Sequence, residues 1–217
     1  MSAPRPVVFD MDGVLVDSEP LYEAGFVSYM NGIGRPELAA WYPNTLGRRR
    51  ADFVAELAEL LARDEDDVIA GLRDAVAPHL AGELPAMPGV PDAVRAIAAG
   101  RTVGLASSSR GSFVDTVLTR LGLDDVLAVR ATGDEVAHGK PHPDLYLLAA
   151  ERLGIDPATA IAIEDTPAGA ASAKAAGMGV IAIPNDHTRD LDLGIADVVL
   201  KDLGEAASWL QGDSAKL

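Results

Sequence analysis

Residues 7–18 read Val-Val-Phe-Asp-Met-Asp-Gly-Val-Leu-Val-Asp-Ser, and this stretch decides both the fold and the chemistry expected of the chain. The apolar run 7–9 has the length and β-branched content of a buried strand. It ends in two carboxylates, Asp10 and Asp12, followed by Gly13. Buried carboxylates are unfavourable without a partner, so the pair predicts a bound cation, and oxygen ligands favour Mg2+. The alternative is a strand that ends in an acidic, solvated turn.

The composition excludes several classes of function. Of the 217 residues, 48% are apolar and 24% are charged, which suffices for a sizeable core. With 33 acidic and 18 basic residues the net charge is −15. This balance disfavours nucleic acid and anionic membranes as partners, because neutralising phosphates needs a basic surface. The chain has no cysteine, so disulfides, zinc-thiolate sites and thiol catalysis are excluded.

The chain also lacks the signals of a membrane or secreted protein. No apolar run approaches the roughly 20 residues of a membrane span. Residues 1–6 lack the apolar region of a secretory signal. We therefore expect a cytoplasmic protein, and a monomer, whose partner is a small molecule.

From residue 85 onward, strand-like runs alternate with helix-like runs, which is typical of a parallel sheet covered on both faces. The expected strands after the first are 102–106, 126–129, 160–163, 179–183 and 198–200. Residues 19–83 instead contain helix-length amphipathic stretches. The sequence thus predicts an α/β core with a helical block inserted after the first strand.

Three of the expected strands end in residues capable of chemistry. These residues are Asp10 with Asp12, Ser107, and Glu164 with Asp165. In open parallel sheets, ligands bind beyond the carboxyl ends of the strands. The three strand ends are therefore expected to converge on one active site.

The two aspartates of the first stretch are candidates for covalent phosphoryl chemistry. Asp10, nearest the strand, is the candidate nucleophile that forms an aspartyl-phosphate. Asp12 is the candidate general acid and base, which protonates the leaving oxygen and then activates water. A metal would screen the repulsion between the phosphate and the attacking carboxylate. For Asp12 the alternative is a turn carboxylate that caps nearby amides.

The residues after the second strand are candidates for phosphate binding. The Ser107 hydroxyl and the adjacent amides, including that of Ser108, would hold phosphoryl oxygens at a helix N-terminus. The alternative for Ser107 is a helix N-cap. Arg110 either adds positive charge near the substrate or only decorates the helix.

Two basic positions are candidates for binding the substrate phosphate. Lys140 lies in His-Gly-Lys-Pro-His-Pro-Asp at 138–144, where the prolines fix the backbone direction. It would neutralise phosphate charge and bridge to Asp10; the alternative is a surface lysine. Arg50 belongs to the basic cluster 48–50, which either reaches the substrate phosphate or is solvated at a helix start.

Taken together, these motifs resemble the haloacid dehalogenase-like hydrolase superfamily, in the subgroup of β-phosphoglucomutase and sugar-phosphate phosphatases. The stretch 10–18 matches the first family motif; the second, third and fourth match Ser107, Lys140 and Glu164-Asp165. The resemblance covers essentially the whole chain.

The resemblance implies a specific architecture and metal site. The fold would be α/β, with a Rossmann-like parallel-sheet core at 1–17 and 85–217 and a helical cap at 18–84. The Mg2+ ligands would be the Asp10 side chain, the backbone carbonyl of Asp12 and the Asp165 side chain, with Glu164 as a further contributor.

The resemblance also implies the reaction. Dehalogenases lack the second aspartate, which Asp12 supplies here, so phosphoryl chemistry is expected. We expect a Mg2+-dependent phosphatase that hydrolyses a small phosphorylated metabolite, a sugar phosphate, through an aspartyl-phosphate on Asp10. The alternative is a phosphosugar mutase of the β-phosphoglucomutase type, which Gly47 and Arg50 resemble as the phosphate-contacting pair of the cap. Such mutases carry a histidine where this chain has Tyr22.

Overall fold

The computed structural model describes residues 4–45, 50–82 and 84–212. The chain divides into two compact units, Met1–Asp17 with Ala86–Leu217, and Ser18–Pro85. Among the described residues, no helix is long and apolar enough to cross a membrane.

The first unit is built on a parallel sheet of six strands within the described residues. The strands are β1 Val7–Phe9, β2 Val103–Ser107, β3 Arg130–Thr132, β4 Ile161–Glu164, β5 Gly179–Ala182 and β6 Val198–Val199. Their order is β3-β2-β1-β4-β5-β6, the arrangement of a Rossmann-like sheet. The central strand β1 is fully buried and pairs with β2 on one side and β4 on the other. The predicted α/β fold is confirmed.

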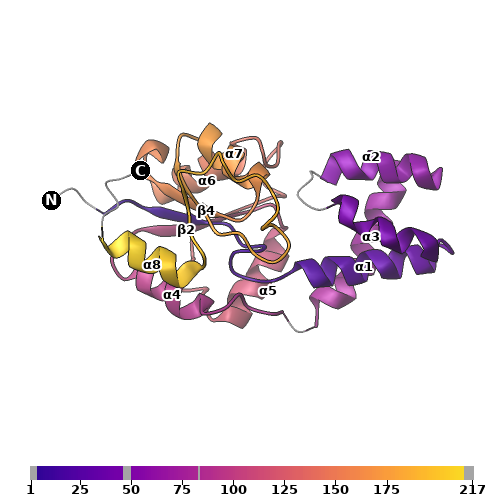
Figure 1. Ribbon diagram of the computed structural model, residues 1–217, viewed down its shortest axis with the longest axis horizontal. Helices are drawn as coiled ribbons and strands as arrows, with labels where there is room; N and C mark the ends of the chain where they lie inside the picture. The colour runs from indigo at the N-terminus through magenta and orange to yellow at the C-terminus, as the bar shows by residue number, and fades with distance from the viewer. Residues whose placement is uncertain (1–3, 46–49, 83, 213–217) are drawn as a thin grey trace. The chain divides into compact units, whose positions relative to one another are not determined.

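Helices cover both faces of this sheet (Figure 1). They are α4 Val90–Ala98, α5 Gly111–Leu121, α6 Asp144–Leu153, α7 Pro167–Ala175 and α8 Leu203–Gly212, with a short 3-10 helix, η2, at Pro157–Thr159. Helices α6 and α7 lie on one face, and α4, α5 and α8 lie on the other (Figure 1). For α4 to α7 this division follows from right-handed crossovers, because the chain moves outward from β1 to β3 and then returns past β1 to β4.

The strand expected at 126–129 is wrong, because the third strand begins only at Arg130. Residues before it form a turn in which the Leu127 amide donates to the Leu123 carbonyl, at 2.8 Å. Leu123 and Leu127 are both fully buried. The apolar run thus belongs to a turn that buries two leucines, and periodicity alone cannot distinguish so short a run from a buried strand.

The second unit consists of helices and their connecting turns within its described residues. It contains α1 Glu19–Gly32, the 3-10 helix η1 Pro36–Thr45, α2 Arg50–Leu61 and α3 Glu65–Leu80. Its core is apolar and aromatic, with Phe26 stacked on Trp41 at a ring separation of 6.3 Å. Gly47 and the side chain of Arg50 lie outside the described residues.

Candidate active site

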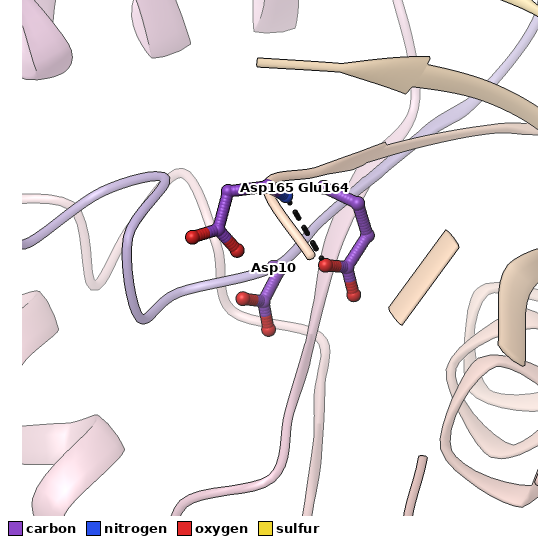
Figure 2. A group of neighbouring side chains, drawn as sticks. All are labelled: Asp10, Glu164 and Asp165. Atoms are coloured by element: carbon purple, nitrogen blue, oxygen red, sulfur yellow. Dashed lines mark hydrogen bonds between the residues drawn. The ribbon is translucent and has the colours of Figure 1, made fainter. Parts of the chain in front are cut away.

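Strand pairing brings three acidic side chains together at the carboxyl edge of the sheet. Phe9 of β1 is in register with Ile163 of β4, so the next residues, Asp10 and Glu164, are neighbours. Asp165 follows at once. One carboxylate oxygen from each of the three lies within 4.8 Å of the others. Figure 2 shows the three carboxylates converging from these two strand ends.

Lys140 connects the acidic residues. Its Nζ donates to Asp10 Oδ1 and to Glu164 Oε1, both at 2.6 Å, and to the Ala106 carbonyl at 3.1 Å. These three acceptors match the three donors of an ammonium group. The Lys140 side chain is only 8% exposed, so the contact to Asp10 expected from the sequence is a buried ion pair.

The charges in this cluster do not balance. Burial raises the pKa of Asp10 to about 8, although Lys140 acts in the opposite direction. Burial, and then repulsion from Asp10, likewise raise the pKa of Asp165 well above its usual range. For Lys140, burial would lower the pKa, but the carboxylates of Asp10 and Glu164 outweigh it and the pKa rises. Three buried carboxylates facing one lysine make a site that favours a further cation.

One oxygen of the cluster is left for such a cation. Asp165 Oδ1 is buried and has no hydrogen-bond partner in the part of the chain that the structure describes. An unpaired buried carboxylate oxygen is costly unless a ligand occupies its lone pairs. The all-oxygen donor set is the kind that Mg2+ prefers, so these residues fit the ion that the sequence predicted.

Asp12 lies beside the loop that follows β2. Its Oδ2 accepts hydrogen bonds from Ser109 Oγ at 2.8 Å and from Ser107 Oγ at 3.4 Å. The cluster formed by one carboxylate oxygen each of Asp10, Glu164 and Asp165 does not include Asp12, so the backbone carbonyl of Asp12 stays a metal ligand only as the resemblance implies. Ser107 is not the N-cap of α5, because that helix begins at Gly111 with Arg110 as its N-cap.

The other phosphate-binding candidates are less buried. Ser108 and Arg110 are exposed on the same loop, so the structure does not bring their side chains into the buried cluster. Ser109, which was not predicted from the sequence, makes the shorter contact to Asp12. Within a run of three serines, nothing in the residue types distinguishes the one that faces Asp12.

Two further residues contact the cluster and were missed from the sequence. The Tyr146 hydroxyl donates to Glu164 Oε1 at 2.7 Å, and its ring lies 5.1 Å from Lys140 Nζ. Asn185, beyond the end of β5, donates from Nδ2 to Asp165 Oδ2 at 2.8 Å. Neither belongs to a charged motif. A signal for Asn185 is its position, because it follows another strand of the same sheet.

The chain resembles known phosphatases over most of its length. The family described as haloacid dehalogenase-like hydrolase matches residues 5–177. Hexitol phosphatase B of Escherichia coli (strain K12) is 36% identical, and the match covers 94% of this chain and 96% of the relative. The phosphorylated carbohydrates phosphatase of Thermotoga maritima is 31% identical, covering 89% of this chain and 93% of the relative.

A solved structure agrees with the sequence relatives. CbbY from Rhodobacter sphaeroides, crystallised in complex with phosphate, superposes with a TM-score of 0.74 at 26% identity, and the match covers 98% of each chain. The family match, the relatives and the site geometry lead to one conclusion. The chain belongs to the haloacid dehalogenase-like hydrolase family, within its subgroup of sugar-phosphate phosphatases.

Proposed function

We propose that this chain is a Mg2+-dependent phosphatase that hydrolyses a small phosphorylated sugar through an aspartyl-phosphate on Asp10. The observation that carries the proposal is the buried cluster in which Lys140 pairs with Asp10 and Glu164 beside Asp165. This cluster lies at the edge of the sheet where ligands of such folds bind. The relatives named for hexitol and for phosphorylated carbohydrates support a sugar phosphate as substrate.

Asp10, Asp165 and the backbone carbonyl of Asp12 would hold the Mg2+ ion. The unpartnered Asp165 Oδ1 supports this assignment. Glu164 would contribute mainly its charge, because Oε1 accepts from Lys140 and Tyr146 while Oε2 accepts from the Asp165 amide. When bound, the ion would neutralise the phosphoryl oxygens that otherwise repel the Asp10 carboxylate.

In the first step Asp10 acts as the nucleophile. A carboxylate oxygen of Asp10 bonds to phosphorus while the bond from phosphorus to the sugar oxygen breaks. Asp12, in its protonated form, gives its proton to that leaving oxygen. Lys140 donates to the attacking carboxylate and keeps it aligned, and the positive charges of Lys140 and of a bound Mg2+ ion would together favour its ionised form. Ser107, Ser108 and Arg110 are proposed to hold the phosphoryl oxygens.

In the second step Asp12 acts as the base. Its carboxylate takes a proton from a water molecule, whose oxygen bonds to phosphorus as the bond to Asp10 breaks. The products are inorganic phosphate and the free Asp10 carboxylate. The hydroxyls of Ser107 and Ser109 would orient Asp12 for both proton transfers.

The helical unit Ser18–Pro85 is proposed to be the cap of the enzyme. Closure of a cap excludes bulk water before chemistry, and opening releases product. The role of Arg50 in binding the substrate phosphate stays a prediction, as do the cytoplasmic location and the monomeric state.

The test is phosphate release from a panel of sugar phosphates, with and without Mg2+. We expect release from at least one of them that requires Mg2+, and a loss of roughly a thousandfold or more in Asp10→Asn. Conversion of β-glucose 1-phosphate without net release, dependent on a bisphosphate activator, would instead identify a mutase. Full turnover by Asp10→Asn would exclude Asp10 as the nucleophile.

A further inference from the structure

Asn185 joins two parts of the candidate active site through one side-chain amide. Its Nδ2 donates to Asp165 Oδ2 at 2.8 Å and to the Gly13 carbonyl at 3.1 Å. Gly13 follows Asp12 directly, and Asp165 follows β4. The single amide therefore links the turn that carries Asp12 to the acidic side chain on the neighbouring strand.

The orientation of this amide is fixed by its other end. Asn185 Oδ1 accepts from the backbone amides of His187 at 2.8 Å and of Thr188 at 3.2 Å. Rotating the amide by half a turn would place NH2 against two N–H donors and oxygen against two acceptors. Donors would then face donors and acceptors would face acceptors, so the geometry permits one orientation. Thr188 Oγ1 also stabilises the turn, because it accepts a hydrogen bond from the backbone N–H of Asn185 at 3.0 Å.

Asn185 makes the two oxygens of Asp165 unequal. Oδ2 accepts the Asn185 hydrogen bond, whereas Oδ1 is buried without a hydrogen-bond partner among the described residues. Because Asp165 is only 3% exposed, solvent does not satisfy the remaining oxygen. The amide thus holds the carboxylate so that Oδ1 is the oxygen available to a cation.

The Asp165 carboxylate and the Asn185 side chain are packed tightly against Gly13. Gly13 has a φ of +80°, and a Cβ there would lie 2.1 Å from Asp165 Oδ2 and 2.8 Å from Asn185 Nδ2. The Asp165 carboxylate and the Asn185 amide thus pack directly against the backbone that follows Asp12. Displacing the amide would free both the turn and the carboxylate.

We propose that Asn185 is a positioning residue that aims Asp165 Oδ1 at the Mg2+ ion and fixes the Asp12–Gly13 turn beside it. The inference rests on the proposed function, since it concerns the same site. Groups that hold a metal ligand in place typically change metal affinity or activity by about 10- to 100-fold when they are removed.

The test compares Asn185→Ser with Thr188→Val in the full-length protein. Serine still accepts hydrogen bonds from the backbone of the turn, but its hydroxyl is too short to reach Asp165. Thr188→Val removes the hydroxyl that accepts a hydrogen bond from the backbone N–H of Asn185. It therefore weakens the same turn but leaves the hydrogen bond from the Asn185 side chain to Asp165 in place. Mg2+ binding is measured by isothermal titration calorimetry, and the melting temperature of each metal-free protein reports folding. Asn185→Ala serves as a second variant if Asn185→Ser does not fold.

We expect Asn185→Ser to weaken Mg2+ binding by about 10- to 100-fold, and Thr188→Val to change it by less than about threefold. With p-nitrophenyl phosphate as substrate, the Mg2+ concentration for half-maximal activity should rise by the same factor in Asn185→Ser. Unchanged Mg2+ affinity in Asn185→Ser, or an equal loss in Thr188→Val, overturns the inference while the proposed function stands. A wild-type protein that does not bind Mg2+ overturns the proposed function and this inference with it.

Discussion

The buried contact between Tyr146 and Glu164 organises the residues around Lys140. Glu164 Oε1 accepts from both the Tyr146 hydroxyl and Lys140 Nζ, and the Tyr146 ring also faces the ammonium. Burial raises the pKa of Tyr146 well above its usual range, with the charge of Glu164 as the second cause, so the hydroxyl keeps its proton and remains a donor. Tyr146 therefore restrains the carboxylate that holds Lys140 against Asp10.

Removing only this hydroxyl, in Tyr146→Phe, should lower kcat by about tenfold. It should also lower the free energy of unfolding by about 1.5–3 kcal/mol, as expected for a hydrogen bond to a charged group. Urea denaturation and steady-state kinetics with p-nitrophenyl phosphate measure the two effects.

Tyr29→Phe is the matched control in the helical unit. The Tyr29 hydroxyl oxygen is buried and has no hydrogen-bond partner within the described residues. Its removal should leave the free energy of unfolding unchanged or raise it, since no bond is lost. Equal destabilisation by the two substitutions would show that the hydrogen bond from Tyr146 to Glu164 does not stabilise the fold.

At the scale of elements, helix α7 owes its close approach to Glu164 to a glycine. A Cβ at Gly169 would lie 2.0 Å from three atoms of the Glu164 carboxylate group. The Gly169 amide donates to Thr166 Oγ1, which caps the first turn of this helix. The glycine thus lets the helix start pack directly on the carboxylate that binds Lys140.

Gly169→Ala should therefore displace Glu164 and lower kcat/KM by at least about tenfold. In a helix, alanine is normally more favourable than glycine by up to about 1 kcal/mol. Gly32→Ala, at the end of α1, is the control substitution, because nothing lies within 4 Å of a Cβ there. Gly32→Ala should keep full activity; if Gly169→Ala does so too, the packing argument is wrong.

Side chains form hydrogen bonds with the free backbone groups of the edge strand β3, where a neighbouring strand would otherwise pair. The Thr132 amide donates to Glu135 Oε2 at 3.0 Å, and Arg152 Nη1 donates to the Arg130 carbonyl at 2.5 Å. Glu135 and Arg152 also form an ion pair at 2.8 Å. The hydrogen bond from Arg152, above all, lowers the pKa of Glu135 from 4.5 to about 2.

A lowered folded-state pKa fixes the sign of the pH dependence. The stabilisation by Glu135 should be fully present above pH 4.5 and be lost as the pH falls toward 2. Glu135→Gln should therefore be less stable than wild type above pH 5, by less than about 1 kcal/mol because the pair is partly exposed. The difference should vanish near pH 2. Urea denaturation across this range checks it, and a difference independent of pH would contradict the assignment.

The elements also show what the sequence could and could not predict. Asp10, Ser107 and Glu164 were found because each follows or ends a recognisable apolar run. Arg130–Thr132 was missed as a strand because three residues at a sheet edge have no measurable periodicity. Tyr146 and Asn185 were missed because their contacts depend on which strands and helices become neighbours. Local sequence patterns do not determine the order of strands in a sheet.

At the scale of the whole molecule, the strand order β3-β2-β1-β4-β5-β6 explains why distant segments share one site. Placing β1 between β2 and β4 brings Asp10 beside Ala106 on one side and Glu164 on the other, and Lys140 Nζ reaches all three. Three of the 33 acidic residues of the chain meet at this strand edge, where we propose that a cation and a phosphate bind.

Transfer of a phosphoryl group to Asp10 can be measured directly. Asp12→Asn should trap the phosphorylated state, because no base remains to activate water. The same substitution removes the acid of the first step, so the phosphoryl donor is p-nitrophenyl phosphate, whose leaving group needs no proton. Intact-mass and peptide-mapping mass spectrometry, after mixing the Asp12→Asn variant with p-nitrophenyl phosphate and Mg2+, measures the adduct directly. We expect one phosphoryl group on the peptide that contains Asp10, and none in the variant that also carries Asp10→Asn. A phosphoryl group on another residue, or steady turnover by Asp10→Asn, would contradict this expectation.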